Sequence, residues 1–203
     1  LGAILKGQDL IVGARGKKYI NWIQQWKVMQ LAHLDRKGRY AGDQVETRTT
    51  GTGGTYRGDG VIGNGGTSEI AFNAEITTAK GFVDLPDSTI VLGNSAFFMS
   101  MGNDSPGSAV AKANVIVVTT ADGVVQDLTV DEVAYMEMFD AAIDGVADAG
   151  HGRVRAITAF TKGGNTDARI VSGATDISIS GTAWAPTTHK GMIYYFDRDP
   201  NAL

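Results

Sequence analysis

The first forty residues predict one long amphipathic helix. At about 100° per residue, the apolar side chains of this stretch gather on one side, with the stem of Lys27 among them. No proline interrupts the pattern, and a basic pair followed by Gly38 is typical of a helix C-terminus. We therefore expect the helix to pack an apolar stripe on the rest of the chain. The stripe consists of Val12, Gly16, Tyr19, Ile20, Ile23, Trp26, Leu31 and Leu34.

The first third of this helix differs from the rest. Before Arg15 the polar residues are Lys6, Gln8 and Asp9, and three glycines weaken the helix. Two interpretations are open. Either the helix continues upstream of Leu1 into a more apolar segment that has been removed, or this end docks on its own domain.

The remaining chain predicts a loop, two shorter helices and a set of short strands. Residues 42–66 are rich in glycine and threonine and show neither helical nor strand periodicity, which indicates a loop with one short strand near Tyr56. Helices are expected at 67–81, capped by Thr67 or Ser68, and at 130–144, where Thr129 and Glu132 have capping-box spacing. Strands are expected at 89–92, 96–101, 115–120, 153–160, 170–171, 177–180 and 192–197. The β-branched run at 115–120 should be a central strand covered on both faces, and 192–197 should be central or close the sheet.

This order of elements indicates an α+β fold. We expect an antiparallel sheet laid on the back half of the long helix, with two shorter helices beside it. The length of 203 residues fits a single domain over 1–203. Within it, residues 1–40 form the helix, 41–81 the glycine-rich loop and a short helix, and 82–203 the sheet with one inserted helix.

Composition narrows the classes of function. The net charge of -4 argues against nucleic acid as the main ligand, although Arg15, Lys17 and Lys18 cluster on the helix, as a local patch or a solvated face. The chain has no cysteine, which excludes disulfides, thiolate zinc sites and cysteine nucleophiles. No apolar run reaches the roughly 18 residues needed to cross a bilayer.

Candidate chemistry is sparse. His33 lies beside the apolar stripe and is expected to be partly buried or exposed, whereas His151 and His189 lie in turns. No histidine pair has metal-ligand spacing on a helix, and no nucleophile motif is present. The cluster at 58–66 is either a surface turn or a calcium loop, with Asp59 and Asn64 as oxygen ligands. Since no catalytic arrangement emerges from these residues, we expect no enzyme activity. Most other aspartates lie in loops, where they are expected to be turn formers.

Four stretches of the sequence, in the same order along the chain, resemble the type IV pilin and type II secretion pseudopilin family. They are residues 4–11, residues 34–43 with Arg39-Tyr40-Ala41-Gly42-Asp43 at the end of the helix, the glycine cluster at 58–66, and residues 134–145 followed by 152–155. Alanine stands at position 41, where many family members have proline. The likeness covers about three quarters of the chain.

The resemblance implies a structural subunit. It would be anchored in the inner membrane through a missing N-terminal segment, and its head would be periplasmic or extracellular. It would assemble through the first helix with copies of itself or other pilins and with the inner-membrane assembly machinery. Some major pseudopilins hold calcium near the C-terminal region, so calcium is a candidate ligand without an assigned ligand set. The lack of cysteine favours a pseudopilin or minor pilin over a major pilin. The alternative is a soluble binding module, or a phage or surface structural protein, that recognises glycan or protein through its loops at 47–66 and 172–188.

Overall fold

A computed structural model describes residues 2–43, 60–62, 85–104, 113–122, 124–160, 170–171, 178–179, 183–198 and 200. The helix expected at 67–81 and the strand expected near Tyr56 lie outside these residues. The α+β class with a long N-terminal helix is confirmed. In chain order the elements are α1 (Gly2–Lys37), β1 (Thr89–Leu92), β2 (Ser95–Asn103), β3 (Asn114–Thr119), α2 (Val130–Asp144), β4 (Val154–Ala159), β5 (Ile170–Val171), β6 (Ser178–Ile179) and β7 (Gly191–Tyr195).

The seven described strands form one sheet, in which six follow one another in the order β1-β2-β3-β7-β4-β6 and β5 pairs with β2 off this path. Neighbours along this path are antiparallel, and β7 enters the middle of the sheet between β3 and β4. The short β5 departs from the expected pattern because it pairs in parallel with β2, at Met101 and Gly102. Every residue of β3 and β7 is buried, which confirms the central position expected for both strands.

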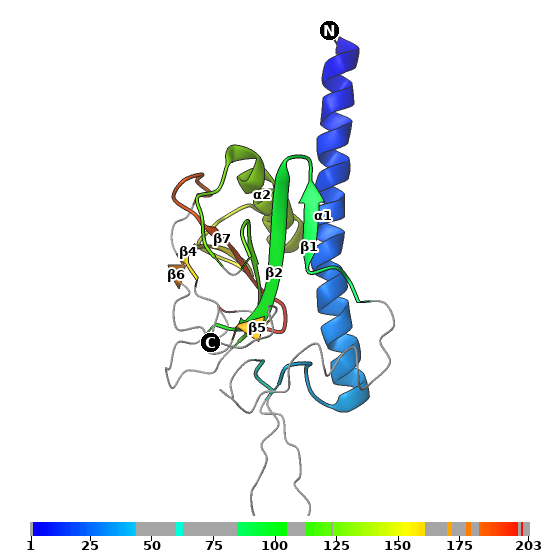
Figure 1. The fold of residues 1–203 in the computed structure, drawn as a ribbon, viewed down its shortest axis with the longest axis vertical. Coiled ribbons are helices and arrows are strands. Elements are labelled where there is room, and N and C mark those ends of the chain that lie inside the picture. Colours follow the sequence, from blue (N-terminus) through cyan, green and yellow to red (C-terminus); the bar gives the residue numbers. More distant parts are fainter. Residues whose placement is uncertain are drawn as a thin grey trace, which may run out of the picture.

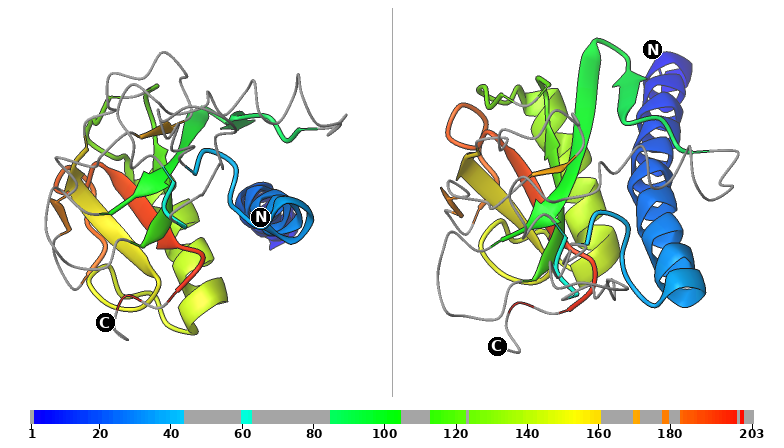
Figure 2. Two further views of the ribbon diagram at one scale, coloured as in Figure 1. Left: turned by 90° about the horizontal axis from the view of Figure 1, so that it is seen from below. Right: turned by 60° about the horizontal axis from the view of Figure 1, so that its bottom comes forward.

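Both helices cover the same face of the sheet (Figures 1 and 2). Alternate residues of β1, β2, β3, β4 and β7 point to this face, as the two-residue period of a strand requires. They form one core with the buried sides of α1 and α2. The sheet contributes Ile90, Leu92, Phe97, Met99, Met101, Ile116, Val118, Val154, Ala156, Met192 and Tyr194.

A second apolar cluster lies on the opposite face of the sheet. It contains the other alternate residues of the central strands, with Val125 packed against it. Its members are Ala113, Val115, Val117, Ile157, Phe160, Ile193 and Tyr195. Burial on both faces explains why β3 reads as a nearly continuous apolar run in the sequence.

Tyr19 of α1 joins the helices to the sheet. Its ring lies 4.8 Å from the ring of Phe97 on β2 and 5.9 Å and 6.3 Å from those of Tyr135 and Phe139 on α2. The pairs with Phe97 and Phe139 are edge-to-face, an arrangement that adds about 0.5–1.5 kcal/mol per pair beyond the area that it buries. The Tyr19 hydroxyl donates to the sulfur of Met192 at 3.5 Å, and burial raises the pKa of Tyr19 well above its ordinary value.

The caps of α2 follow the sequence prediction. The Thr129 hydroxyl oxygen accepts a hydrogen bond from the backbone N–H of Glu132 at 3.3 Å, and the Glu132 carboxylate accepts one from the backbone N–H of Thr129 at 2.8 Å. Gly145 then ends the helix with a left-handed backbone, at a φ of 84°. The predicted capping box and stop are therefore confirmed.

The buried face of α1 differs in part from the predicted stripe. Val12 and Leu31 were expected inside, yet they are 44% and 40% exposed, so these two assignments are wrong. The expectation that His33 is partly buried or exposed is also wrong, because its side chain is fully buried. The buried positions recur every three or four residues, as on one side of a helix. They are Gly16, Tyr19, Trp22, Ile23, Trp26, Met29, Gln30 and His33.

Polar side chains explain why Leu31 is not part of the buried face. The side-chain amide of Gln30 donates to the carbonyl of Ala41 at 3.0 Å and accepts from the N–H of Ala41 at 2.9 Å. Nδ1 of His33 lies 2.9 Å from the carbonyl oxygen of Arg39. Both residues therefore turn inward to hold the chain that follows Gly38, and Leu31 points outward. A pattern of apolar residues alone does not indicate such buried polar contacts.

Candidate interaction surface

The candidate interaction surface lies on α1, the longest element of the described residues. Its N-terminal end projects beyond the sheet (Figure 1). Arg15 lies against the turn between β1 and β2, since its Nη1 atom would be only 2.8 Å from a Cβ atom added to Gly93 in that turn. The projecting part of α1 therefore begins near Arg15. We call residues 2–14 the stem. At about 1.5 Å per residue the stem is roughly 20 Å long.

The side of α1 that faces away from the sheet carries a second stripe, which we call the outer stripe. Leu10, Val28 and Leu31 are 75%, 62% and 40% exposed. The spacing of three and four residues places them on one side of the helix. The outer stripe consists of Leu10, Ala14, Lys17, Asn21, Gln24, Val28 and Leu31, and Lys17 is its only charged residue.

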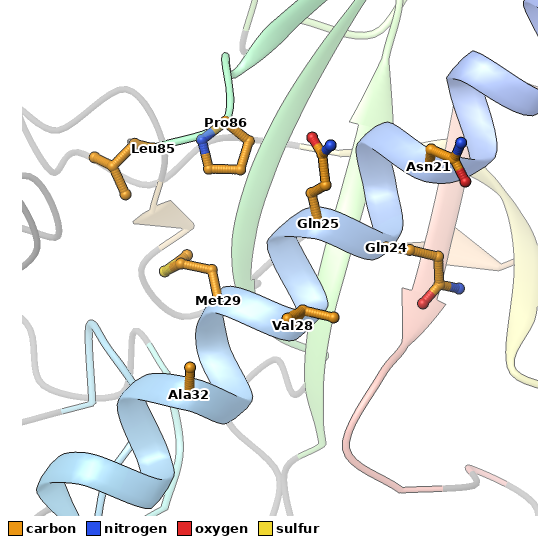
Figure 3. Close-up of a pocket in the computed structure, with 8 residues that line it drawn as sticks. All are labelled: Asn21, Gln24, Gln25, Val28, Met29, Ala32, Leu85 and Pro86. Carbon is orange, nitrogen blue, oxygen red and sulfur yellow. The ribbon is translucent and has the colours of Figure 1, made fainter. Parts of the chain in front are cut away.

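A groove runs beside the outer stripe. It has a volume of about 720 Å³ and lies between α1 and the segment that leads into β1 (Figure 3). Met29 and Val28 supply apolar surface from the helix, and Leu85 and Pro86 form the facing side. The other lining residues are Asn21, Gln24, Gln25 and Ala32, all neutral. A groove of neutral amide and apolar groups is suited to contact with another helix or an extended segment.

A second groove, of about 680 Å³, lies nearer the stem. Lys17 and Lys18 line one part of it, and Asn21, Gln25 and Thr89 add groups that can donate hydrogen bonds. Among the described residues that line it, Asp87 is the one that is acidic. The remaining lining residues are Ala14, Trp22, Ile90 and Val91.

Side-chain contacts hold α1 rigidly against the domain. The indole N–H groups of Trp22 and Trp26 both donate to the carbonyl oxygen of Asp87, at 2.6 Å and 3.2 Å. On the other flank, the ammonium of Lys27 lies 5.8 Å from the centre of the Tyr194 ring, a cation–π distance. The outer stripe is therefore presented from a helix whose position is set by the core.

A polar network at the far end of the sheet is structural. The Asn114 side chain donates to the carboxylate of Asp197 at 2.8 Å and to the carbonyl of Gly60 at 2.7 Å. Its oxygen accepts from the N–H of Ile62 at 2.7 Å. The network ties residues 60–62 to β3, and the Asn114 amide uses its donors and acceptor on protein groups.

Aspartates gather around the end of α2. Oδ2 of Asp140 accepts hydrogen bonds from the indole of Trp184 and from the N–H of Asp148, both at 2.8 Å. Its Oδ1 has no donor among the described residues. Burial, together with the negative charge of Asp144, raises the pKa of Asp140 to about 6, although those two hydrogen bonds act to lower it. Asp144 in turn accepts from the N–H groups of Arg153 and Val154.

The expectation that most aspartates are turn formers in loops does not hold for Asp140, which lies within α2 and accepts a hydrogen bond from the side chain of Trp184. Within the described residues, no three histidine, aspartate or glutamate side chains are arranged to hold a metal ion. The candidate calcium ligands Asp59 and Asn64 lie outside those residues. The calcium expectation therefore remains a prediction for that loop.

The side chains of the three histidines are not in contact with one another. His151 is exposed and lies 3.1 Å from the Asp148 carboxylate. His189 is buried, and its Nδ1 accepts a hydrogen bond from the N–H of Ala185 at 3.0 Å. The loops of the alternative binding module lie mostly outside the described residues, so the structure adds nothing for or against them.

In the described part of the chain no helix has the length and apolar character needed to span a bilayer. The molecule thus belongs to the α+β class, with two helices on one face of a mainly antiparallel sheet. The sequence matches no family model, no curated protein and no solved structure.

Proposed function

We propose that this protein is a pilin-like structural subunit of a filament, of the type IV pilus or type II secretion pseudopilus kind. In this proposal α1 assembles the subunits, and its upstream continuation anchors them in the inner membrane before assembly. The head would then lie on the periplasmic or extracellular side. One observation carries the proposal: a single long helix is held by its inner face and presents a separate outer stripe along its length.

The outer stripe is suited to repeated contact with other copies. Fully burying a leucine or valine side chain contributes about 1.5–3 kcal/mol. Leu10, Val28 and Leu31 together can therefore contribute several kcal/mol. Association costs a similar amount in lost translational and rotational freedom. A single contact of this size is weak, whereas a subunit with several neighbours in a filament gains from each of them.

The proposed function requires no reaction. Its partners are copies of the same chain, other pilins and the assembly machinery of the inner membrane. Nucleic acid is not the main ligand in this proposal, because the chain carries a net charge of -4.

A matched pair of substitutions tests the role of the outer stripe. Val28 lies on it, and Val146 is exposed to a similar degree, 62% against 71%, just beyond the end of α2. In cells that express the complete gene, we expect Val28→Glu to abolish filaments seen by electron microscopy and Val146→Glu to preserve them. Normal filaments from Val28→Glu protein would contradict the proposal.

The absence of cysteine permits a second test. A cysteine placed at position 28 or 31 should give crosslinked ladders in assembled material, whereas one at position 146 should not. The gene sequence upstream of Leu1 is an independent check. A basic leader followed by an apolar run is expected for a pilin-like subunit, and a binding module that starts at Leu1 would argue against one.

A further inference from the structure

The exposed side of α2 is acidic. The helix contains five acidic residues and no basic one. Two of the five carboxylates are used inside the domain, one in the capping box and one in the core. We give the name acidic face to four residues, none of them buried, whose spacing of three and four places them on one side of the helix. They are Ala134, Glu137, Ala141 and Asp144.

The described part of the domain does not neutralise the acidic face. Among the described residues, no cation forms an ion pair with Glu137 or Asp144. Asp144 also lies in the last turn of α2, where the helix dipole favours a cation, and that turn contains no basic residue. Cations supplied by another molecule would therefore be attracted to this face.

The second groove beside α1 has the opposite charge, and we call it the basic groove. Lys17 and Lys18 line it, both are exposed, and neither forms an ion pair with a carboxylate of the described residues. Two lysines outweigh the single carboxylate of Asp87 in its described lining. The helix beside it adds to the field, since residues 10–34 include four cations and no acidic residue in a chain whose net charge is -4.

The basic groove and the acidic face lie on different flanks of α1. The second helix approaches α1 at Gly16, where an added Cβ atom would lie 2.5 Å from the sulfur of Met138. Gln25, which lines the groove, lies nine residues further along, so at about 100° per residue it points to the opposite side of α1. Figure 2 shows the same arrangement, with β1 and α2 on different sides of α1. One partner therefore cannot occupy both surfaces of a copy at once.

From this arrangement we infer that the acidic face of one copy docks in the basic groove of a second copy. Glu137 and Asp144 pair with the two lysines of the groove, and the small side chain of Ala141 lets the backbone of α2 approach. Each copy uses its groove on one neighbour and its acidic face on the other, so the contact is heterologous and repeats along a chain of subunits.

This inference deepens the proposed function, on which it rests, by naming the surfaces through which neighbouring heads contact one another. The outer stripe supplies apolar burial that is the same for many orientations of two helices. Complementary charges fix the register of two partners and exclude pairings that bring like charges together. The acidic face and the basic groove would therefore decide which orientation of the heads the filament adopts.

Disulfide crosslinking tests the inference, because the chain has no cysteine of its own. One chain carries Ala14→Cys, in the basic groove, and a second carries Ala141→Cys, in the acidic face, so every charge stays in place. The two 203-residue chains are mixed under mild oxidation at about 50 mM salt. The matched control replaces the first chain by one with Ala32→Cys, since Ala32 lies on the same helix roughly 27 Å from Ala14.

We expect crosslinked pairs in the test mixture, and only background crosslinking in the control mixture and in either chain alone. The yield should fall at about 500 mM salt. Charge reversal in the groove by Lys17→Glu/Lys18→Glu should lower the yield by about tenfold or more, because like charges would then face each other. Glu137→Lys/Asp144→Asn in the second chain should do the same, and asparagine keeps an oxygen for the backbone N–H groups that Asp144 binds.

Combining the two charge changes is the decisive measurement. Opposite charges face each other again in that mixture, so the crosslinking yield should recover. Circular dichroism checks that every variant is folded. A yield that ignores the charge changes, or one that does not recover when they are combined, would overturn the inference.

The outcomes separate this inference from the proposed function. If crosslinking follows the expected pattern but the complete gene gives no filaments in cells, the filament proposal fails alone. If Lys17→Glu/Lys18→Glu protein forms normal filaments in cells, the docking inference is wrong and the filament proposal stands.

Discussion

Gln30 provides the sharpest test of how α1 is joined to the domain. Its fully buried amide forms two hydrogen bonds with the backbone of Ala41, and its nitrogen also lies 3.1 Å from the sulfur of Met101. Replacement of Gln30 by Met keeps the length and helix propensity of the side chain. It leaves the N–H and C=O of Ala41 buried without partners, at about 1–3 kcal/mol for each group. We therefore expect Gln30→Met to lower the free energy of unfolding by about 2–5 kcal/mol, a large part of the roughly 5–15 kcal/mol of a typical domain.

The measurement is urea unfolding followed by tryptophan fluorescence, since Trp22 and Trp26 of α1 are buried in the core. Gln25→Met is the matched control. Gln25 lies on the same helix and is exposed, so its replacement should change the free energy of unfolding by no more than about 0.5 kcal/mol. A Gln30→Met variant that loses less than about 1 kcal/mol, or that matches the control, would refute the reasoning. Faster amide exchange at Ala41 in the variant would locate the loss at the predicted contact.

Two further predictions concern the packing of the helices and the titration of Asp140. Gly13→Ala should stabilise the protein by about 0.5–1 kcal/mol, because the site is open and alanine favours a helix. Gly16→Ala should gain about 1 kcal/mol less in stability, because its Cβ would lie 2.5 Å from the sulfur of Met138. Equal gains in thermal unfolding at both sites would show that α1 and α2 do not approach closely there. The pKa of Asp140, about 6 in the fold against an ordinary 3.8, means that the folded state holds a proton that the unfolded state releases. Stability should therefore fall by on the order of 2–3 kcal/mol as pH rises from about 4 to above 6. Asp140→Asn should flatten this decline, and parallel pH profiles of unfolding for the two proteins would contradict the assignment.

The local features of the chain were predictable because they depend on neighbouring residues. The extent of α1 to near Gly38, the capping box at Thr129 and the stop at Gly145 all follow from backbone groups within one helical turn. The buried strand at 115–120 was recognisable from its β-branched side chains alone. For the candidate surface, the sequence identified the helix and its three clustered cations.

The orientation of α1 about its own axis was predicted only in part. Trp22 and Met29 were not assigned to the buried stripe, and Leu31 was assigned to it wrongly. The signal that decides the matter is polar, since Gln30 and His33 turn inward to bond the backbone at Ala41 and Arg39. Contacts of this kind depend on the course of the chain after the helix, which cannot be predicted from hydrophobic periodicity.

Taken by itself, the sequence determined an α+β protein built on a long first helix, the caps of the second helix and the position of most strands. The tertiary structure alone decided that β7 enters the sheet between β3 and β4 and that α2 lies beside α1 on one face. It also decided which residues of α1 remain outside to form the outer stripe, and that Arg15 lies beside the turn between β1 and β2. The physical reason is the distance along the chain over which each feature is decided. Helix caps and hydrophobic periodicity depend on residues a few positions apart, whereas strand order and helix docking depend on burial shared between segments far apart in the chain.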